Sequence, residues 1–259
     1  MDLGIKGRRA IVCGASRGLG FGCASALVRE GADVVIVART EDAVIAAAKV
    51  LNEQGPGHAR GVVADVASEA GRATLLAACP EPDILINNAG GPPPGDFRQW
   101  GRAEWIAALD SNMLSAIDLI KATIDPMIAR KFGRIVNITS HMVKEPTAML
   151  GLSNGARAGL TGFVGGLARD VARHGVTVNN LLPGQFDTDR LRSNHEKFAT
   201  RTGANLDEFR ERMRNDVPAK RFGNAEEFGA VCAFLCSQYA GYITGANLLL
   251  DGGQYRGLM

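Results

Sequence analysis

The chain has 259 residues, and its 29 Lys and Arg nearly balance its 27 Asp and Glu. This balance gives no reason to expect binding to nucleic acid or to an anionic membrane. No apolar run approaches the roughly 18 residues of a membrane span, and the first residues lack the apolar core of a signal peptide, so we expect a cytoplasmic protein. The cysteines show no C-x-x-C spacing and the histidines are scattered, so no metal site is expected.

Short apolar segments alternate with helical patterns along the whole chain. Strands are predicted at 8–14, 33–38, 60–66, 83–88, 134–139, 176–182 and 247–253. Helices are predicted at 21–30, at 43–54 and, as one long amphipathic helix, at about 104–130. Each strand is a continuous apolar run, which is typical of parallel strands buried on both faces. The pattern predicts a single domain, 1–259, with a Rossmann-type doubly wound α/β fold: a seven-stranded parallel sheet with helices on both faces.

Two segments interrupt this alternation. Residues 90–97 are rich in Pro and Gly and are predicted to form a loop. Residues 187–221 are highly charged, with amphipathic helical spacing at 206–215. We interpret 187–221 as a lid-like insertion over the ligand crevice, and the alternative is a helical excursion that only meets solvent.

A glycine-rich turn joins the first predicted strand to the first predicted helix. Glycines here let the backbone approach a pyrophosphate, and the N-terminus of the following helix supplies free N–H donors and a favourable dipole. Because the turn lies in the first strand–turn–helix unit, it predicts dinucleotide binding. The residues expected to contact the cofactor are Gly14, Ser16, Arg17, Gly18, Leu19 and Gly20.

The residues after the second predicted strand select between the two nicotinamide dinucleotides. An acidic residue there would hydrogen-bond the adenosine ribose of NAD, but the chain has Arg39 and Thr40, and Asp33 lies at the other end of the strand. The guanidinium groups of Arg39 and Arg17 suit a 2′-phosphate, unless both are ordinary surface residues. We therefore expect NADP(H) to be preferred over NAD(H).

Several motifs follow the glycine turn in a fixed order. N-N-A-G occurs at 87–90, Ser140 follows the fifth predicted strand, P-G-x-F-x-T occurs at 183–188, and I-T-G-A-N-L-L-L-D-G-G occurs at 243–253. Over nearly the whole chain these motifs resemble the short-chain dehydrogenase/reductase family, with Cys13 in place of that family's usual Thr in the turn.

The resemblance implies roles for further residues. Asn112 and Ser140 fall where the family keeps its active-site Asn and its catalytic Ser. The other cofactor contacts that it implies are Asp65 and Val66 at the adenine, Asn88, Ala89 and Gly90 after the fourth strand, and Pro183, Gly184, Phe186 and Thr188 beside the nicotinamide. The family also implies a small-molecule carbonyl or alcohol substrate and a homo-oligomer, often a tetramer.

The family's most diagnostic motif is altered. A Tyr-x-x-x-Lys pair is expected thirteen residues after Ser140, where this chain has Ser153 and Arg157. The flanking residues 158–163 fit without a gap, and the tyrosines all lie beyond residue 238. Similar S-x-x-x-K-x-P loops accompany the Ser/Arg pair in an atypical branch that resembles 3-ketoacyl-carrier-protein reductases.

This change affects proton transfer more than cofactor binding. In the family the Tyr protonates the alkoxide left by hydride transfer, and the Lys lowers the phenol pKa from about 10 toward neutral. Ser153 is shorter and far less acidic, whereas Arg157 can hold the nicotinamide ribose but effectively never deprotonates. Lys144, if it lies beside Arg157 in a desolvated pocket, is a candidate for the missing acid, and the alternative is a surface lysine. His141 in the same loop is another candidate.

Three functions remain compatible with the sequence. The first is an NADP(H)-dependent oxidoreductase with Ser140, Asn112, Arg157, Ser153 and Lys144 as a non-standard catalytic set. The second is a catalytically silent NADP(H)-binding protein, and the third is a non-redox enzyme using the same pocket. Retention of Ser140 and Asn112 favours the first, because a pure binder needs no oxyanion donor beside the nicotinamide. A mostly apolar pocket is predicted from Met142, Met149, Leu150, Leu152, Phe186 and Phe198.

Overall fold

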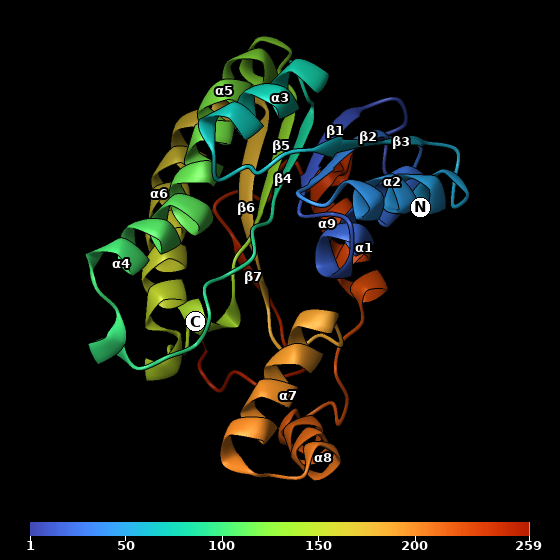
Figure 1. Cartoon of the computed structure of the whole chain (residues 1–259). Helices are drawn as coiled ribbons and strands as arrows, with labels where there is room; N and C mark the ends of the chain where they lie inside the picture. Colours follow the sequence, from blue (N-terminus) through green and yellow to red (C-terminus); the bar gives the residue numbers. More distant parts are fainter. Residues whose placement is uncertain (259) are drawn as a thin grey trace.

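The computed structural model describes residues 1–258, and its centre is a parallel sheet of seven strands in the order β3-β2-β1-β4-β5-β6-β7 (Figure 1). The strands are β1 (Arg9–Cys13), β2 (Asp33–Ala38), β3 (His58–Val63), β4 (Ile84–Asn87), β5 (Gly133–Ile138), β6 (Val176–Pro183) and β7 (Asn247–Leu250). The strand order reverses between β1 and β4, and at such a switch point a crevice opens beyond the carboxyl ends of the strands. The predicted fold class is confirmed.

Helices cover both faces of the sheet (Figure 1). They are α1 (Gly18–Arg29), α2 (Glu41–Asn52), α3 (Glu69–Ala78), α4 (Arg102–Leu109), α5 (Ser115–Ala129), α6 (Gly151–Val171), α7 (Asp189–Thr202), α8 (Leu206–Asp216) and α9 (Ala225–Cys236). Helices α1, α2 and α9 share one buried apolar cluster with the sheet, and α3, α5 and α6 share the other. Among residues 1–258, no helix is long and apolar enough to cross a membrane.

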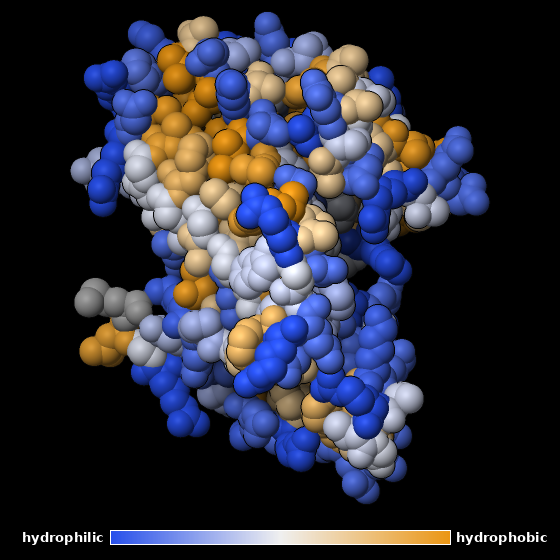
Figure 2. Space-filling model, turned by 60° about the vertical axis from the view of Figure 1, so that its left-hand side comes forward, coloured by the Kyte–Doolittle hydropathy of each residue, from blue (hydrophilic) through white to orange (hydrophobic). Residues whose placement is uncertain are grey.

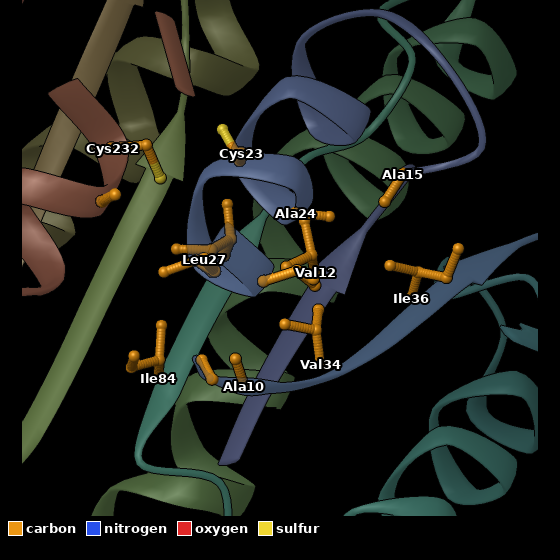
Figure 3. Close-up of a cluster of buried hydrophobic side chains, with 14 of the residues drawn as sticks. Ala10, Val12, Ala15, Cys23, Ala24, Leu27, Val34, Ile36, Ile84 and Cys232 are labelled. Atoms are coloured by element: carbon orange, nitrogen blue, oxygen red, sulfur yellow. The ribbon is translucent and has the colours of Figure 1, made fainter. Parts of the chain in front are cut away.

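Strand β1 shows why the strands are apolar throughout. Successive side chains of a strand point to opposite faces, so Ala10 and Val12 pack toward α1 while Ile11 and Cys13 belong to the opposite cluster. Figure 3 shows Val12 beside Leu27 and Ala24 of α1, with Ala10 farther along the strand. Leu27 is fully buried, and burying a leucine side chain contributes roughly 1.5–3 kcal/mol. This packing fixes α1 above β1, and therefore fixes the glycine turn between them.

The long helix predicted at about 104–130 is wrong as a single element. Helix α4 ends at Leu109, a π-helical turn spans Asp110–Leu114, and α5 begins at Ser115. The apolar periodicity runs through both helices, so it does not reveal the wider turn between them. Such π turns inside helices often occur at functional sites, and this one contains Asn112.

Smaller differences occur at several other boundaries, among them the start of α1 and the end of β3. Helix α1 begins at Gly18 rather than at 21, because Arg17 is the extended residue that caps it. Strand β3 ends at Val63, three residues earlier than predicted, and the chain then turns so that Asp65 accepts a hydrogen bond from the backbone N–H of Ala67.

The charged insertion forms two helices beyond the carboxyl end of β6 (Figure 1). The amphipathic segment predicted at 206–215 corresponds to α8. Helices α7 and α8 pack through Phe198 and Phe209, whose rings stack with centroids 4.5 Å apart. A bridge between Phe186 and Gly223 joins the two ends of the insertion. That the insertion acts as a lid remains a prediction.

Candidate active site

The glycine turn has the backbone that a phosphate site requires. Gly14 and Gly18 have φ of +58° and +61°, a region that favours glycine. A Cβ on Gly20 would lie 2.4 Å from the carbonyl oxygen of Gly14, so no larger residue fits there. Arg17 is the N-cap residue of α1, and its side chain makes no capping hydrogen bond. The first N–H groups of α1 are therefore available to an anion, and the turn fits a dinucleotide pyrophosphate.

Asn88 connects this turn to the end of β4. Its side-chain amide donates to the carbonyl oxygen of Gly14 at 3.1 Å. The neighbouring strand residue Asn87 is buried and donates to Asn137 of β5 at 2.9 Å. Together these amides hold the ends of three strands in register, and residues 88–90 are thereby placed beside the glycine turn.

The residues predicted to select the cofactor lie at the surface. Arg39 follows β2 and is exposed, and Thr40 is the N-cap of α2, with no capping hydrogen bond from its side chain. Arg17 is exposed and lies 3.6 Å from the carboxylate of Asp189. Both guanidinium groups are therefore accessible to a ligand beside the turn.

Ser153 and Arg157 lie one helical turn apart near the start of α6, and their side chains meet. Nε of Arg157 donates to Oγ of Ser153 at 3.2 Å. The other guanidinium nitrogens donate to backbone carbonyls, Nη1 to Ile138 at 2.7 Å and Nη2 to Ala89 at 3.1 Å. A single buried side chain thus connects α6 to the ends of β4 and β5.

Burial makes Arg157 an unusual cation. It is 9% exposed, and desolvation, followed by the positive charge of Arg190, lowers the pKa of Arg157 to about 10. At neutral pH the guanidinium stays protonated. It is therefore a fixed positive charge at the carboxyl edge of the sheet, suited to binding rather than to proton transfer.

Asn112 lies beside the same carbonyls. It is buried in the π turn, and its amide nitrogen approaches the carbonyl oxygen of Gly90 at 3.4 Å. Its Oδ1 has no hydrogen-bond partner, and neither has Oδ1 of Asn87. A cavity of about 20 Å³ lies between Asn112, Asn87 and Arg157, which is enough for one water. Such a water would satisfy both amide oxygens.

Cys13 also lines this cavity. Burial raises the pKa of the Cys13 thiol to about 12, although a hydrogen bond from the Asn88 backbone opposes this effect. The thiol therefore stays protonated at neutral pH and is chemically inert, as expected for a buried cysteine.

Ser140 and the loop after it lie at the end of β5. Ser140 accepts a hydrogen bond from the backbone N–H of Met142 at 3.1 Å and caps a single 3₁₀ turn. The ring of His141 makes a 3.0 Å hydrogen bond to the carbonyl oxygen of Pro183, which ends β6. Lys144 closes the turn, and its ammonium lies 5.5 Å from the centre of the Tyr255 ring. Lys144 is thus placed against the C-terminal segment, and the structure describes no contact between Lys144 and Arg157.

The segment after β6 reaches the glycine turn. Thr188 caps α7 by accepting from the N–H of Leu191, and its methyl group would lie 3.6 Å from a Cβ on Gly18. Two residues predicted to line an apolar pocket lie elsewhere. Phe186 is buried in the core against Phe228, with ring centroids 5.2 Å apart, and Phe198 is stacked on Phe209 inside the insertion. Apolar spacing alone does not distinguish a core residue from a pocket residue.

Arg190 was missed by the sequence reasoning. It is the second residue of α7, and its Nη2 donates to the carbonyl oxygen of Gly91 at 2.9 Å. Its position two residues after Thr188 is the only sequence signal for it, and that signal does not show which way the side chain turns.

Comparison with known proteins identifies the family. A family profile described as enoyl-(acyl carrier protein) reductase matches residues 14–254. The chain belongs to the short-chain dehydrogenase/reductase family. It is 35% identical over 255 residues to a 3-oxoacyl-(acyl-carrier-protein) reductase of Vibrio harveyi. The aligned region covers 98% of this chain and 99% of the relative.

Solved structures of the short-chain dehydrogenase/reductase family superimpose closely on this chain. The L-sorbose reductase of Gluconobacter frateurii, complexed with NADPH and L-sorbose, has a TM-score of 0.93 at 28% identity and covers 100% of both chains. A 3-oxoacyl (acyl-carrier-protein) reductase of Agrobacterium tumefaciens with NADP bound has a TM-score of 0.88 at 27% identity, covering 97% of this chain and 96% of the other.

The insertion contains a buried histidine with a pH-dependent contribution to stability. His195 lies edge-on to Phe209, with ring centroids 5.2 Å apart, and its Nδ1 has no partner. Burial, and then the charge of Arg210, lower the pKa of His195 below its ordinary 6.5, while Asp187 opposes the shift. His195 is therefore neutral in the folded protein at pH 7.

We expect this histidine to destabilise the insertion in acid. Between pH 6.5 and the lowered pKa of His195, the unfolded chain binds more protons than the folded chain, so the free energy of unfolding falls as pH falls. The Tm of the wild type should decrease more between pH 7.5 and 5.5 than that of His195→Leu. His58→Gln, which alters an exposed histidine, is the control and should follow the wild type. Equal slopes for His195→Leu and the wild type would contradict the assignment.

Proposed function

We propose that the chain is an NADP(H)-dependent oxidoreductase that transfers a hydride between the nicotinamide and a carbonyl or alcohol carbon. One observation carries the proposal: Asn112, Ser153 and Arg157 gather around the carbonyls of residues 89–90, beside a glycine turn whose helix N-terminus is free. A reducible group bound there would lie at the switch point of the sheet, where doubly wound folds bind ligands. The NADPH and NADP complexes of the two structural relatives support the choice of cofactor.

The residues that would hold the cofactor are those of the turn together with Arg39, Asp65, Asn88 and Thr188. When bound, NADPH supplies the hydride. Arg157 would orient the nicotinamide ribose through its fixed guanidinium, and Ser140 with Asn112 would polarise the carbonyl. The proton for the resulting alkoxide would come from Lys144, or from a water held by Ser153, Asn112 and Arg157, because Ser153 and Arg157 stand where the family's Tyr and Lys are expected.

Steady-state oxidation of NADPH against a panel of ketones and aldehydes tests this function. Turnover of any of them, with stoichiometric alcohol product, is the expected result. Tight NADPH binding without turnover would instead indicate the catalytically silent binder. A substrate changed without NADPH consumption would indicate a non-redox enzyme.

The cofactor preference should depend on Arg39. We expect NADPH to bind more tightly than NADH, and Arg39→Asp to reduce the preference roughly 10- to 100-fold, because a charge-assisted hydrogen bond to the 2′-phosphate contributes about 1.5–3 kcal/mol. Fluorescence titration with both cofactors measures the ratio. Arg212→Asp, on the distant α8, is the control for the change in net charge. Wild-type protein that binds NADH at least as well as NADPH would refute the proposal.

We also propose a cytoplasmic homo-oligomer, with a tetramer as the expected state. Figure 2 shows apolar surface on the side of the molecule where α5 and α6 lie. Trp105, Ile106 and Leu114 on and after α4 are 37%, 43% and 43% exposed. Light scattering on the purified protein measures the assembly, and a monomer at micromolar concentration would contradict the homo-oligomer.

The proposed compartment is supported by the cysteines. All five are buried and free, which suits a reducing compartment.

A further inference from the structure

Two arginines from distant parts of the chain converge beside Gly91. A Cβ on Gly91 would lie 3.1 Å from Nη2 of Arg190, 3.5 Å from Nη2 of Arg157 and 3.6 Å from Oγ of Ser153. Arg157 rises from α6 beneath this point, and Arg190 reaches it from the N-terminal turn of α7. Three polar groups therefore surround one small region at the edge of the sheet.

Neither guanidinium is neutralised within the described part of the chain. Arg157 donates to Ser153, Ile138 and Ala89, and Arg190 donates to Gly91, so every partner is a neutral oxygen. Each cation also lies in the field of the other, which disfavours the pair. An anion between them would relieve this repulsion.

The region between Arg157, Arg190 and Ser153 is separate from the phosphate site at the glycine turn. Asp189 and Arg190 are adjacent, but Asp189 faces Arg17 at the turn, whereas Arg190 turns toward Gly91 and Arg157. Arg157 is buried and Arg190 is exposed, so Arg190 is the more accessible of the two cations. Ser153 accepts from Arg157, which leaves its hydroxyl hydrogen free to donate.

We propose that Arg190 and Ser153, beside the fixed positive charge of Arg157, bind a carboxylate of the substrate, so that the substrate is an oxo acid or the corresponding hydroxy acid. The nitrogens of Arg157 stay with the protein oxygens and with the nicotinamide ribose. Planar guanidinium forks pair with carboxylates in bidentate fashion. The carboxylate would anchor the molecule while its carbonyl lies nearer Ser140 and Asn112. The role of the carbonyl rests on the hydride-transfer function proposed above, whereas the carboxylate site does not.

Two pairs of compounds test the site: benzoylformate with methyl benzoylformate, and acetoacetate with methyl acetoacetate. Their affinities for the NADP⁺-loaded protein, measured calorimetrically, need no turnover. We expect each acid to bind at least tenfold more tightly than its ester. In Arg190→Gln the affinity for the acids should fall roughly 10- to 100-fold, which is the range for hydrogen bonds to charged groups. The affinities for the esters and for NADP⁺ should fall much less. Arg190→Lys should retain part of the preference, and Arg201→Gln, on the exposed far end of α7, should retain all of it.

Other outcomes separate this proposal from the proposed function. Equal binding of acids and esters by the wild type, or no binding of either to protein that binds NADP⁺, would overturn the carboxylate site. A loss of NADP⁺ affinity in Arg190→Gln as large as the loss for the acids would assign Arg190 to the cofactor instead. Acids that bind through Arg190 but do not oxidise NADPH would preserve the carboxylate site and refute the assignment of these oxo acids as substrates, whereas the oxidoreductase itself is tested by the panel of ketones and aldehydes above.

Discussion

Replacing Lys144 with methionine should lower turnover roughly 100- to 10,000-fold, the usual contribution of general acid catalysis, if Lys144 protonates the alkoxide. Affinity for NADPH should hardly change, because Lys144 lies over Tyr255 and away from the glycine turn. For Lys144 to act, the loop that follows Ser140 must bring the ammonium from Tyr255 to the substrate. Stopped-flow measurement of the hydride-transfer step, with the NADPH dissociation constant measured in parallel, separates the two effects.

Lys121→Met, which removes an exposed lysine of α5, is the matched control and should behave as the wild type. Undiminished turnover in Lys144→Met would eliminate Lys144 as the acid. The remaining route would then be a water in the small cavity lined by Asn112 and Arg157. In that case Asn112→Ala, rather than Lys144→Met, should slow the hydride-transfer step.

The elements that depend on local pattern were predicted well. Strand β2 has the predicted bounds, because the run from Val34 to Ala38 is apolar throughout and has polar residues on both sides. The glycine turn was also predictable, since Gly14, Gly18 and Gly20 fulfil backbone requirements that few other residues meet. Features set by a strand–turn–helix unit can therefore be derived from the sequence.

Features that depend on side-chain direction were not predictable. Phe198 has the spacing of a pocket residue but stacks inside the insertion, and the π turn around Asn112 leaves no mark on the apolar periodicity. Arg190 meets Arg157 only because α7 returns over the sheet edge, a tertiary relation across 33 positions of chain. A sequence motif predicts Arg157, but no motif indicates that Arg190 lies near it.

Arg157 should affect ligand binding far more than stability. Two opposing terms act on stability when Arg157→Met removes the guanidinium. The change leaves the buried carbonyls of Ile138 and Ala89 without a donor, at a cost of about 1–3 kcal/mol each. It also removes a buried charge. Burial, and then the charge of Arg190, lower the pKa of Arg157 from 12.5 to about 10, which corresponds to roughly 3 kcal/mol against the charged form. These terms are similar in size and opposite in sign.

We therefore expect the Tm of Arg157→Met to stay within several degrees of the wild type below pH 9, while affinity for NADPH or for a substrate anion falls roughly 100-fold or more. The pH dependence provides a separate check. Because the pKa of Arg157 is lower when folded, the unfolded wild type binds more protons between pH 10 and 12.5, so its stability relative to the variant rises with pH over that range. Denaturant unfolding of both proteins at pH 8 and pH 10.5 measures this difference. If the difference in free energy of unfolding between the two proteins is constant, or moves in favour of the variant, Arg157 carries no desolvation penalty. If the variant binds ligands normally, Arg157 is not part of the binding site.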